Sequence, residues 1–106
     1  MSLRKTGRAI LLEGTSQTIN GSLGLGTYAI GGYSRIVGQF SGVGSATFQW
    51  NSQQVSGTTL VASSIPVNAG LTVFDQVNYG GRFMNFAFSA ANSANFTYFI
   101  VGEPAR

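Results

Sequence analysis

The sequence predicts an all-β domain built as an antiparallel β-sandwich, and three observations carry this prediction. Val, Ile, Thr, Phe and Tyr are frequent while Glu and Lys are scarce, which is a composition typical of strands. Fifteen glycines and two prolines punctuate the chain, and the runs between them are about 5–9 residues long, as in a sandwich or barrel. No helical periodicity persists for more than a turn. We therefore expect about eight short strands in a single domain over residues 1–106, because no linker divides the chain.

The first half of the chain contains four of the expected strands. They cover residues 8–13, 28–30, 33–40 and 46–50. Asn20-Gly21 is a strong turn signal between the first two, because this pair readily adopts the positive φ angles of tight hairpin turns. In the fourth strand, alternation places Ala46, Phe48 and Trp50 on one face, which is the face expected to meet the core.

The second half supplies the other four strands. They cover residues 58–65, 71–77, 82–89 and 95–101. Pro66 is expected to stop the first of these, because proline has no N–H to donate to a sheet. In the second, the odd-numbered residues from Leu71 to Val77 share one face, and Phe74 lies on the other. The last two are expected to form a hairpin around a polar loop at residues 90–94.

The last expected strand is apolar on both faces. Phe96, Tyr98 and Ile100 lie together, with Phe99 and Val101 opposite, whereas a half-exposed antiparallel strand should alternate. Charged residues are only 8% of the chain, against about 25% in a typical domain. Both observations predict a homo-oligomer, with Phe83, Phe99 and Val101 at the subunit interface. The alternative is that Phe99 and Val101 cover a sheet edge or lie under a loop.

A small basic cluster stands at the start of the chain, where Arg4, Lys5 and Arg8 lie close together in a chain of net charge +3. Residues 1–7 are expected to form a flexible basic arm. As a contact, the arm would face an acidic or lattice partner. The plainer interpretation is a solvated terminus, and nucleic acid is a disfavoured partner because three charges release few counterions.

The residues needed for common catalytic chemistry are missing. The chain has no histidine and no cysteine, which removes Ser-His-Asp and thiolate sites and the usual zinc ligands. Its three carboxylates, Glu13, Asp75 and Glu103, are scattered, and calcium and glycosidase sites need converging acidic residues. We expect no catalytic residue, no metal and no cofactor, and hence a protein that is not an enzyme.

An aromatic and amide cluster offers one binding alternative. Trp50 is flanked by amides that could hydrogen-bond a sugar while the ring stacks on it; they are Gln49, Asn51, Gln53 and Gln54. This arrangement would suit a carbohydrate-binding module or lectin. The favoured interpretation places Trp50 in the core beside Phe48, because the local alternation supports it.

Three segments carry a resemblance to a known group of proteins. The run Tyr-Ser-Arg-Ile-Val-Gly-Gln-Phe at 33–40, Ser-Ala-Thr-Phe-Gln-Trp at 45–50 and Gly-Gly-Arg-Phe at 80–83 resemble the small β-sandwich modules of bacteriophage virion proteins, including decoration, head-fibre and tail-associated proteins. The resemblance implies a jelly-roll-like or immunoglobulin-like sandwich. It also implies a structural virion protein, a capsid decoration or accessory subunit, acting as a homotrimer or other homo-oligomer on a capsid or tail lattice.

The sequence carries no targeting signal that would contradict that expectation. The apolar run after the basic start is shorter than the roughly 7–15 residues of a secretory h-region. No stretch approaches the roughly 20 apolar residues of a membrane-spanning helix. We therefore expect no membrane contact, and a protein made in the host cytoplasm and assembled there into the virion.

Overall fold

The computed structural model describes residues 9–54 and 59–104, and these residues are almost all in strands. Within them there is no helix, so the all-β class is confirmed. The six strands of this part are β1 (Ala9–Ala29), β2 (Tyr33–Val43), β3 (Ala46–Gln53), β4 (Thr59–Val67), β5 (Gly70–Val77) and β6 (Phe83–Pro104).

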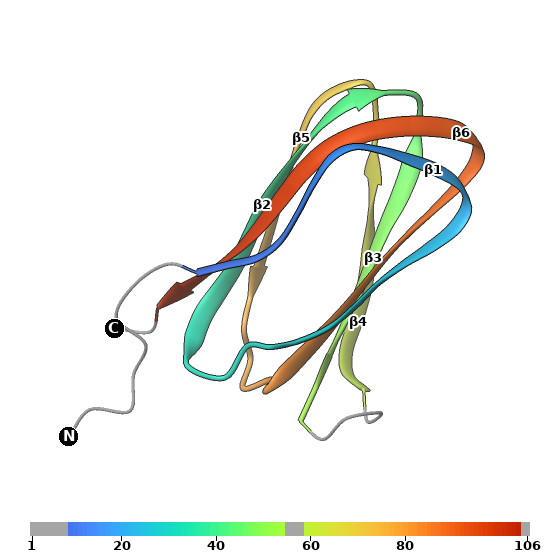
Figure 1. The fold of residues 1–106 in the computed structure, drawn as a ribbon. Helices are drawn as coiled ribbons and strands as arrows, with labels where there is room; N and C mark the ends of the chain where they lie inside the picture. Colours follow the sequence, from blue (N-terminus) through green and yellow to red (C-terminus); the bar gives the residue numbers. More distant parts are fainter. Residues whose placement is uncertain (1–8, 55–58, 105–106) are drawn as a thin grey trace.

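All strands belong to one antiparallel sheet organised around β6. The sheet order is β4-β3-β6-β2-β5, and β1 pairs with the other edge of β6. The first part of β6 pairs with β3 and its last part with β2, whereas β1 follows β6 from Gly102 back to Phe83. The sheet curls into a half-barrel, as the long ribbons of β1 and β6 show (Figure 1).

The sheet bends along one line that runs across its whole width. Ile19 of β1 pairs with Ala94 of β6, but Gly21 pairs with Ala90, so β6 takes the longer path around the bend. On the other edge of β6, residues 44–45 connect β2 to β3, so that β2 pairs with one part of β6 and β3 with the other. β5 pairs with β2 on one side of the bend, and β4 pairs with β3 on the other side. The sheet is thereby divided into two facing halves.

We name these halves after the strand that each pairs with β6. The β3 half contains β4, β3, residues 83–89 of β6 and residues 21–29 of β1. The β2 half contains β5, β2, residues 95–104 of β6 and residues 9–19 of β1.

The predicted number of strands is wrong, because two pairs of expected strands are continuous. The expected hairpin of 82–89 and 95–101 is the single strand β6, since Ala94 and Ala90 pair with β1 on the two sides of the bend, with residues 91–93 between them. The expected turn at Asn20-Gly21 lies within the continuous strand β1, opposite a bulge in β6; Gly21 has a φ of 82° and the register shifts there. Glycine takes this φ at no steric cost, so the chain bends without leaving the sheet.

Pro66 does not end its strand. β4 continues to Val67, with Pro66 opposite Thr47 of β3. Because β4 is an edge strand, one side of its backbone has no partner strand in the sheet, and a proline nitrogen on that side costs no ladder hydrogen bond.

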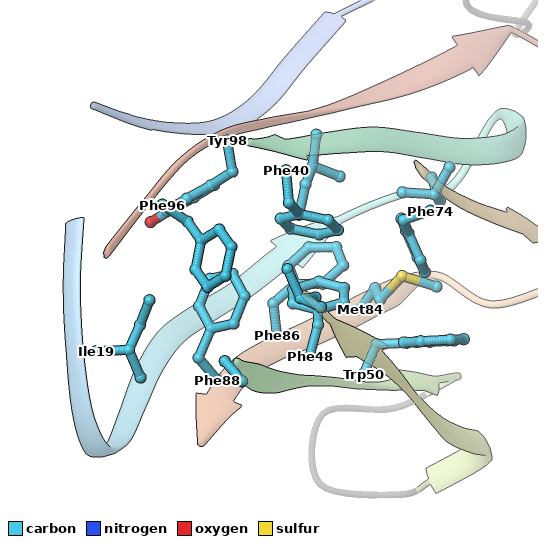
Figure 2. Close-up of a cluster of buried hydrophobic side chains, with 14 of the residues drawn as sticks. Ile19, Phe40, Phe48, Trp50, Phe74, Met84, Phe86, Phe88, Phe96 and Tyr98 are labelled. Atoms are coloured by element: carbon cyan, nitrogen blue, oxygen red, sulfur yellow. The ribbon is translucent and has the colours of Figure 1, made fainter. Parts of the chain in front are cut away.

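The core lies between the two halves and is largely aromatic (Figure 2). Phe48 of β3 is at its centre, with no exposed surface. Its ring centroid lies 4.8 Å from that of Phe40, 5.2 Å from those of Phe74 and Phe88, and 5.7 Å from that of Phe86. Each such side chain contributes about 1.5–3 kcal/mol by burial, and each ring pair about 0.5–1.5 kcal/mol more.

One asparagine joins two turns at the end of the half-barrel away from the bend. Asn78 Nδ2 donates to the carbonyl oxygens of Tyr33 (2.8 Å), Gly81 (3.1 Å) and Ile30 (3.2 Å). Its Oδ1 accepts from the N–H of Gly81 at 2.7 Å. These bonds fix the turn after β1 against the turn after β5.

Candidate functional site

The outer surface of the β2 half carries exposed large apolar side chains. In β5, Phe74 points into the core with 1% exposure, whereas Leu71 and Val73 point outward with 66% and 62% exposure. Neighbouring strands add further exposed side chains to this surface. We call the set the apolar outer face: Ile10, Val43, Leu71, Val73, Val77 and Phe99.

The register shows how these side chains lie relative to one another. Val73 of β5 is opposite Gln39 of β2, which is opposite Phe99 of β6, which in turn is opposite Glu13 of β1. One row across the sheet therefore alternates apolar and polar residues, while the apolar side chains are most concentrated along β5. A surface of this kind is typical of a protein–protein contact.

The three predicted interface residues do not gather on this face. Phe99 is part of it, with 38% exposure. Val101 is in the neighbouring row, opposite Ile10, but is only 6% exposed. Phe83 is half-buried at the far end of the β3 half, opposite Gln53.

Sequence reasoning missed most of this face. The strand at 71–77 was predicted with two faces, and nothing in it showed which one meets the core. Three aliphatic residues on one face suggest burial, but the single ring of Phe74 fills the core instead. The signal that was available is the low charge of the chain, since the apolar residues that exceed the capacity of a small core remain at the surface.

An exposed ion pair lies beside this apolar surface. Arg35 of β2 binds both carboxylate oxygens of Asp75 of β5. Arg35 Nε donates to Asp75 Oδ1 at 3.2 Å, and a terminal guanidinium nitrogen of Arg35 donates to Asp75 Oδ2. These hydrogen bonds, followed by the attraction of the Asp75 charge, raise the pKa of the Arg35 guanidinium. Because both side chains are about half exposed, solvent screens the pair and its effect on stability is small.

Among its described side chains, the outer surface of the β3 half is largely polar and carries no charge. A shallow groove of about 420 Å³ runs over it, and its polar lining residues are Gln49, Asn51, Ser63, Ser64 and Asn85. Asn85 Nδ2 donates to Thr27 Oγ1 at 2.9 Å. Amides and hydroxyls of this kind can hydrogen-bond a polar ligand, but they do not form an apolar contact.

Trp50 is not available as an exposed stacking platform in this half. Its side chain is 6% exposed, stacks on Phe48 and makes an edge contact with Phe74. Its Nε1 donates to Oε1 of Gln76 at 3.1 Å. Gln53 is also buried and donates to Asn51 Oδ1 at 2.7 Å, whereas Gln49 and Gln54 are exposed.

Two of the three carboxylates, Glu13 and Asp75, are kept apart by the register, while Glu103 is opposite Arg35 of β2. Glu13 and Asp75 are on β1 and β5, with β6 and β2 between them, so they lie about 14 Å apart at the usual strand spacing. Paired glycosidase carboxylates are about 5–9.5 Å apart. In the described parts of the chain, no three potential metal-ligating residues gather together.

The remaining titratable group of interest is a core tyrosine. Burial raises the pKa of the Tyr98 phenol, and the nearby Tyr28 raises it further. Its ring packs against Phe40 and Phe88, so Tyr98 is a neutral core side chain at physiological pH.

The other predicted contacts fall on segments without a structural description. Arg4, Lys5 and Arg8 of the basic arm precede the described residues. Among residues 9–54 and 59–104, no helix could span a membrane. Comparison with protein-family models, with curated proteins and with solved structures finds no match to this chain.

Proposed function

We propose that this chain is a structural, self-associating subunit, and specifically a capsid decoration or accessory protein of a virion that acts as a homo-oligomer. The observation that carries the proposal is the apolar outer face of the β2 half, with side chains such as Leu71 and Val73 more than three-fifths exposed. Exposed apolar surface costs free energy that association recovers. The low charge of the chain supports the same conclusion, since permanent interfaces are more apolar than transient ones.

The proposal extends to the finer class of the fold. The β3 half and the β2 half would be the two layers of a jelly-roll-like or immunoglobulin-like sandwich. Their facing aromatic core supports this comparison, and the continuous strands β1 and β6 would be the corners where the chain passes from one layer to the other.

The mechanism would be mass action on a repeated lattice. A subunit that binds only the assembled state stabilises that state. Linking several subunits into one oligomer then multiplies weak individual contacts. Arg4, Lys5 and Arg8 remain the proposed contact for an acidic or lattice partner.

The mass of the chain in solution tests self-association directly. Light scattering coupled to size exclusion should give a multiple of 11.1 kDa at micromolar concentration. A stable monomer at about 100 μM, near the weak end of specific association, would contradict the proposal. Capsid or tail genes beside the gene would support the virion assignment, and their absence would remove it.

A second candidate function rests on the polar groove of the β3 half. Its exposed amides and hydroxyls suit a carbohydrate ligand bound by hydrogen bonds without ring stacking, since Trp50 is buried. A glycan array should then show binding that Asn51→Ala and Asn85→Ala both weaken, with Ser41→Ala in the β2 half as the control. No binding by the unaltered chain would exclude this candidate.

A further inference from the structure

Within residues 9–54 and 59–104, the sheet has three stretches of free edge, formed by β1, β4 and β5, and they differ in how well they are protected against pairing. β1 is interrupted by register shifts, with positive φ at Ser16, Gly21 and Gly26. β4 contains Pro66, and its pairing with β3 also shifts at Ser52. Bulges and prolines are the usual devices that prevent edge strands from pairing with other chains.

Apart from a positive φ at its first residue, Gly70, β5 has none of these devices. Its eight residues pair with β2 without a register shift, and none of them is proline or lysine. Its one charged side chain, Asp75, is already paired with Arg35. Leu71, Val73 and Val77 project from it into solvent. β5 is therefore a regular, apolar and unprotected edge.

The hydrogen bonds at the end of β5 show which backbone groups are free. The N–H of Asn78 donates to the carbonyl of Ser34 in β2 at 2.8 Å, so the even-numbered residues face β2. The odd-numbered residues 71, 73, 75 and 77 then direct their N–H and C=O groups to the open edge. Consistent with this, the side-chain amide of Gln76 bonds the carbonyl of Val77 at 2.8 Å.

We propose that β5 pairs antiparallel with β5 of a second copy, about a two-fold axis at Phe74, and so joins two β2 halves into one continuous sheet. This inference rests on the proposed self-association and names the element that performs it. A two-fold antiparallel pair must match outward-directed residues with outward-directed residues. The axis can therefore lie at Val73, Phe74 or Asp75.

The charges and apolar side chains select among these three registers. An axis at Asp75 places two carboxylates directly opposite each other, which is destabilising. An axis at Val73 places Leu71 opposite Asp75 of the second copy. An axis at Phe74 also places an apolar residue, Val73, opposite Asp75 of the second copy, but it pairs Leu71 with Val77 and joins all four outward residues in about eight backbone hydrogen bonds, whereas an axis at Val73 joins only three of them. It leaves the Arg35–Asp75 pairs intact.

Two substitutions of matched chemistry separate edge pairing from packing of the outer faces. Val73 and Val43 are exposed to similar extents, 62% and 65%, but Val43 is on the interior strand β2. Val73→Lys should raise the dimer dissociation constant by about tenfold or more, and Val43→Lys should leave it nearly unchanged. The opposite result would overturn the inference while leaving self-association in place.

Disulfide trapping tests the register, and the absence of cysteine makes it clean. Leu71→Cys mixed with Val77→Cys should give a cross-linked dimer after mild oxidation, because residues opposite each other in a sheet lie within disulfide range. Leu71→Cys alone should not cross-link. Cross-linking of Val73→Cys alone would place the axis at Val73 and overturn the proposed register. A wild-type oligomer that gives no cross-link in the mixture, nor with Val73→Cys or Asp75→Cys alone, would overturn edge pairing, and a wild-type monomer would overturn the proposed function as well.

Discussion

The β2 half and the β3 half share one core but present opposite chemistry to the outside. Inward, both contribute phenylalanine: Phe40 and Phe74 from one half, Phe48 and Phe86 from the other. Outward, the β2 half exposes aliphatic side chains and the β3 half exposes amides and hydroxyls. Packing constrains the inward positions of both halves alike, so the two halves differ in chemistry at their outer faces.

The largest expected effect comes from Phe48, whose ring contacts aromatic residues of both halves. Phe48→Ala should lower the free energy of unfolding by about 3–5 kcal/mol, because its ring touches aromatic residues from three strands of the core. Gln49→Ala, one residue away but exposed, should change it by less than about 0.5 kcal/mol.

Urea denaturation followed by fluorescence and by circular dichroism measures both variants. A single transition by both probes is expected, since one core joins the halves. Two separate transitions, or a small effect of Phe48→Ala, would show that the halves fold independently and would break the comparison.

A second effect distinguishes how closely the strands approach in each half. A Cβ on Gly42, in the β2 half, would lie 2.0 Å from the carbonyl oxygen of Asn95 and 2.8 Å from Cα of Phe96. Gly42→Ala must therefore push β2 from β6 and should cost about 1–3 kcal/mol of stability. Thermal unfolding would measure the loss.

Gly24 in the β3 half is the matched control. A Cβ there meets no atom within 4 Å, and its φ is not positive. Gly24→Ala should be neutral or stabilise by about 0.4–1 kcal/mol, through lower entropy of the unfolded chain. Equal losses for the two variants would mean that the close approach at Gly42 does not matter.

The sequence predicts the inward faces better than the outward ones. Alternation correctly placed Phe48 and Trp50 in the core, as it grouped Phe96, Tyr98 and Ile100, because local period-two patterns report sidedness directly. It did not reveal that β1 and β6 continue through their bends. Turn-like residues such as Asn20-Gly21 also suit a bulge, and only pairing with a distant strand decides between the two.

The candidate site was harder to predict for the same reason. Phe99 and Val101 were predicted to lie together on the side of their strand that faces away from the core. Phe99 does lie on the apolar outer face, but Val101 is largely buried. Leu71 and Val73 join Phe99 only because β5 lies beside β2 and β2 beside β6. Strand order is a long-range property that no local spacing encodes, so a surface built from several strands could not be assembled from sequence.

The pH dependence of stability provides a smaller effect from within the core. Burial raises the pKa of Tyr98 in the folded chain. The stabilisation that this shift gives to the folded chain is fully present below the unfolded pKa of about 10. It is lost as the pH rises from there through the higher folded value, since the unfolded chain releases the proton first. Unfolding free energy measured from pH 8 to 11 should therefore fall more steeply for the wild type than for Tyr98→Phe. A slope unchanged by Tyr98→Phe would contradict the assignment.

The smallest effect is expected at the Arg35–Asp75 ion pair beside the apolar outer face. Arg35 gains a raised pKa from Asp75, and this contribution is lost only as the pH rises above the arginine range, so it does not vary near neutrality. Arg35→Gln and Asp75→Asn should each leave the unfolding midpoint of the monomer nearly unchanged, with any difference reduced further by 0.5 M salt, where screening is about 4–5 Å in range. Association should be weakened by either substitution, because Arg35→Gln leaves the Asp75 charge unpaired and Asp75→Asn leaves the Arg35 charge unpaired. That unpaired charge would then lie at or near the joined edge. A dissociation constant that rises with either single substitution, and recovers in the double variant, would show that the pair serves the outer face rather than the stability of the chain.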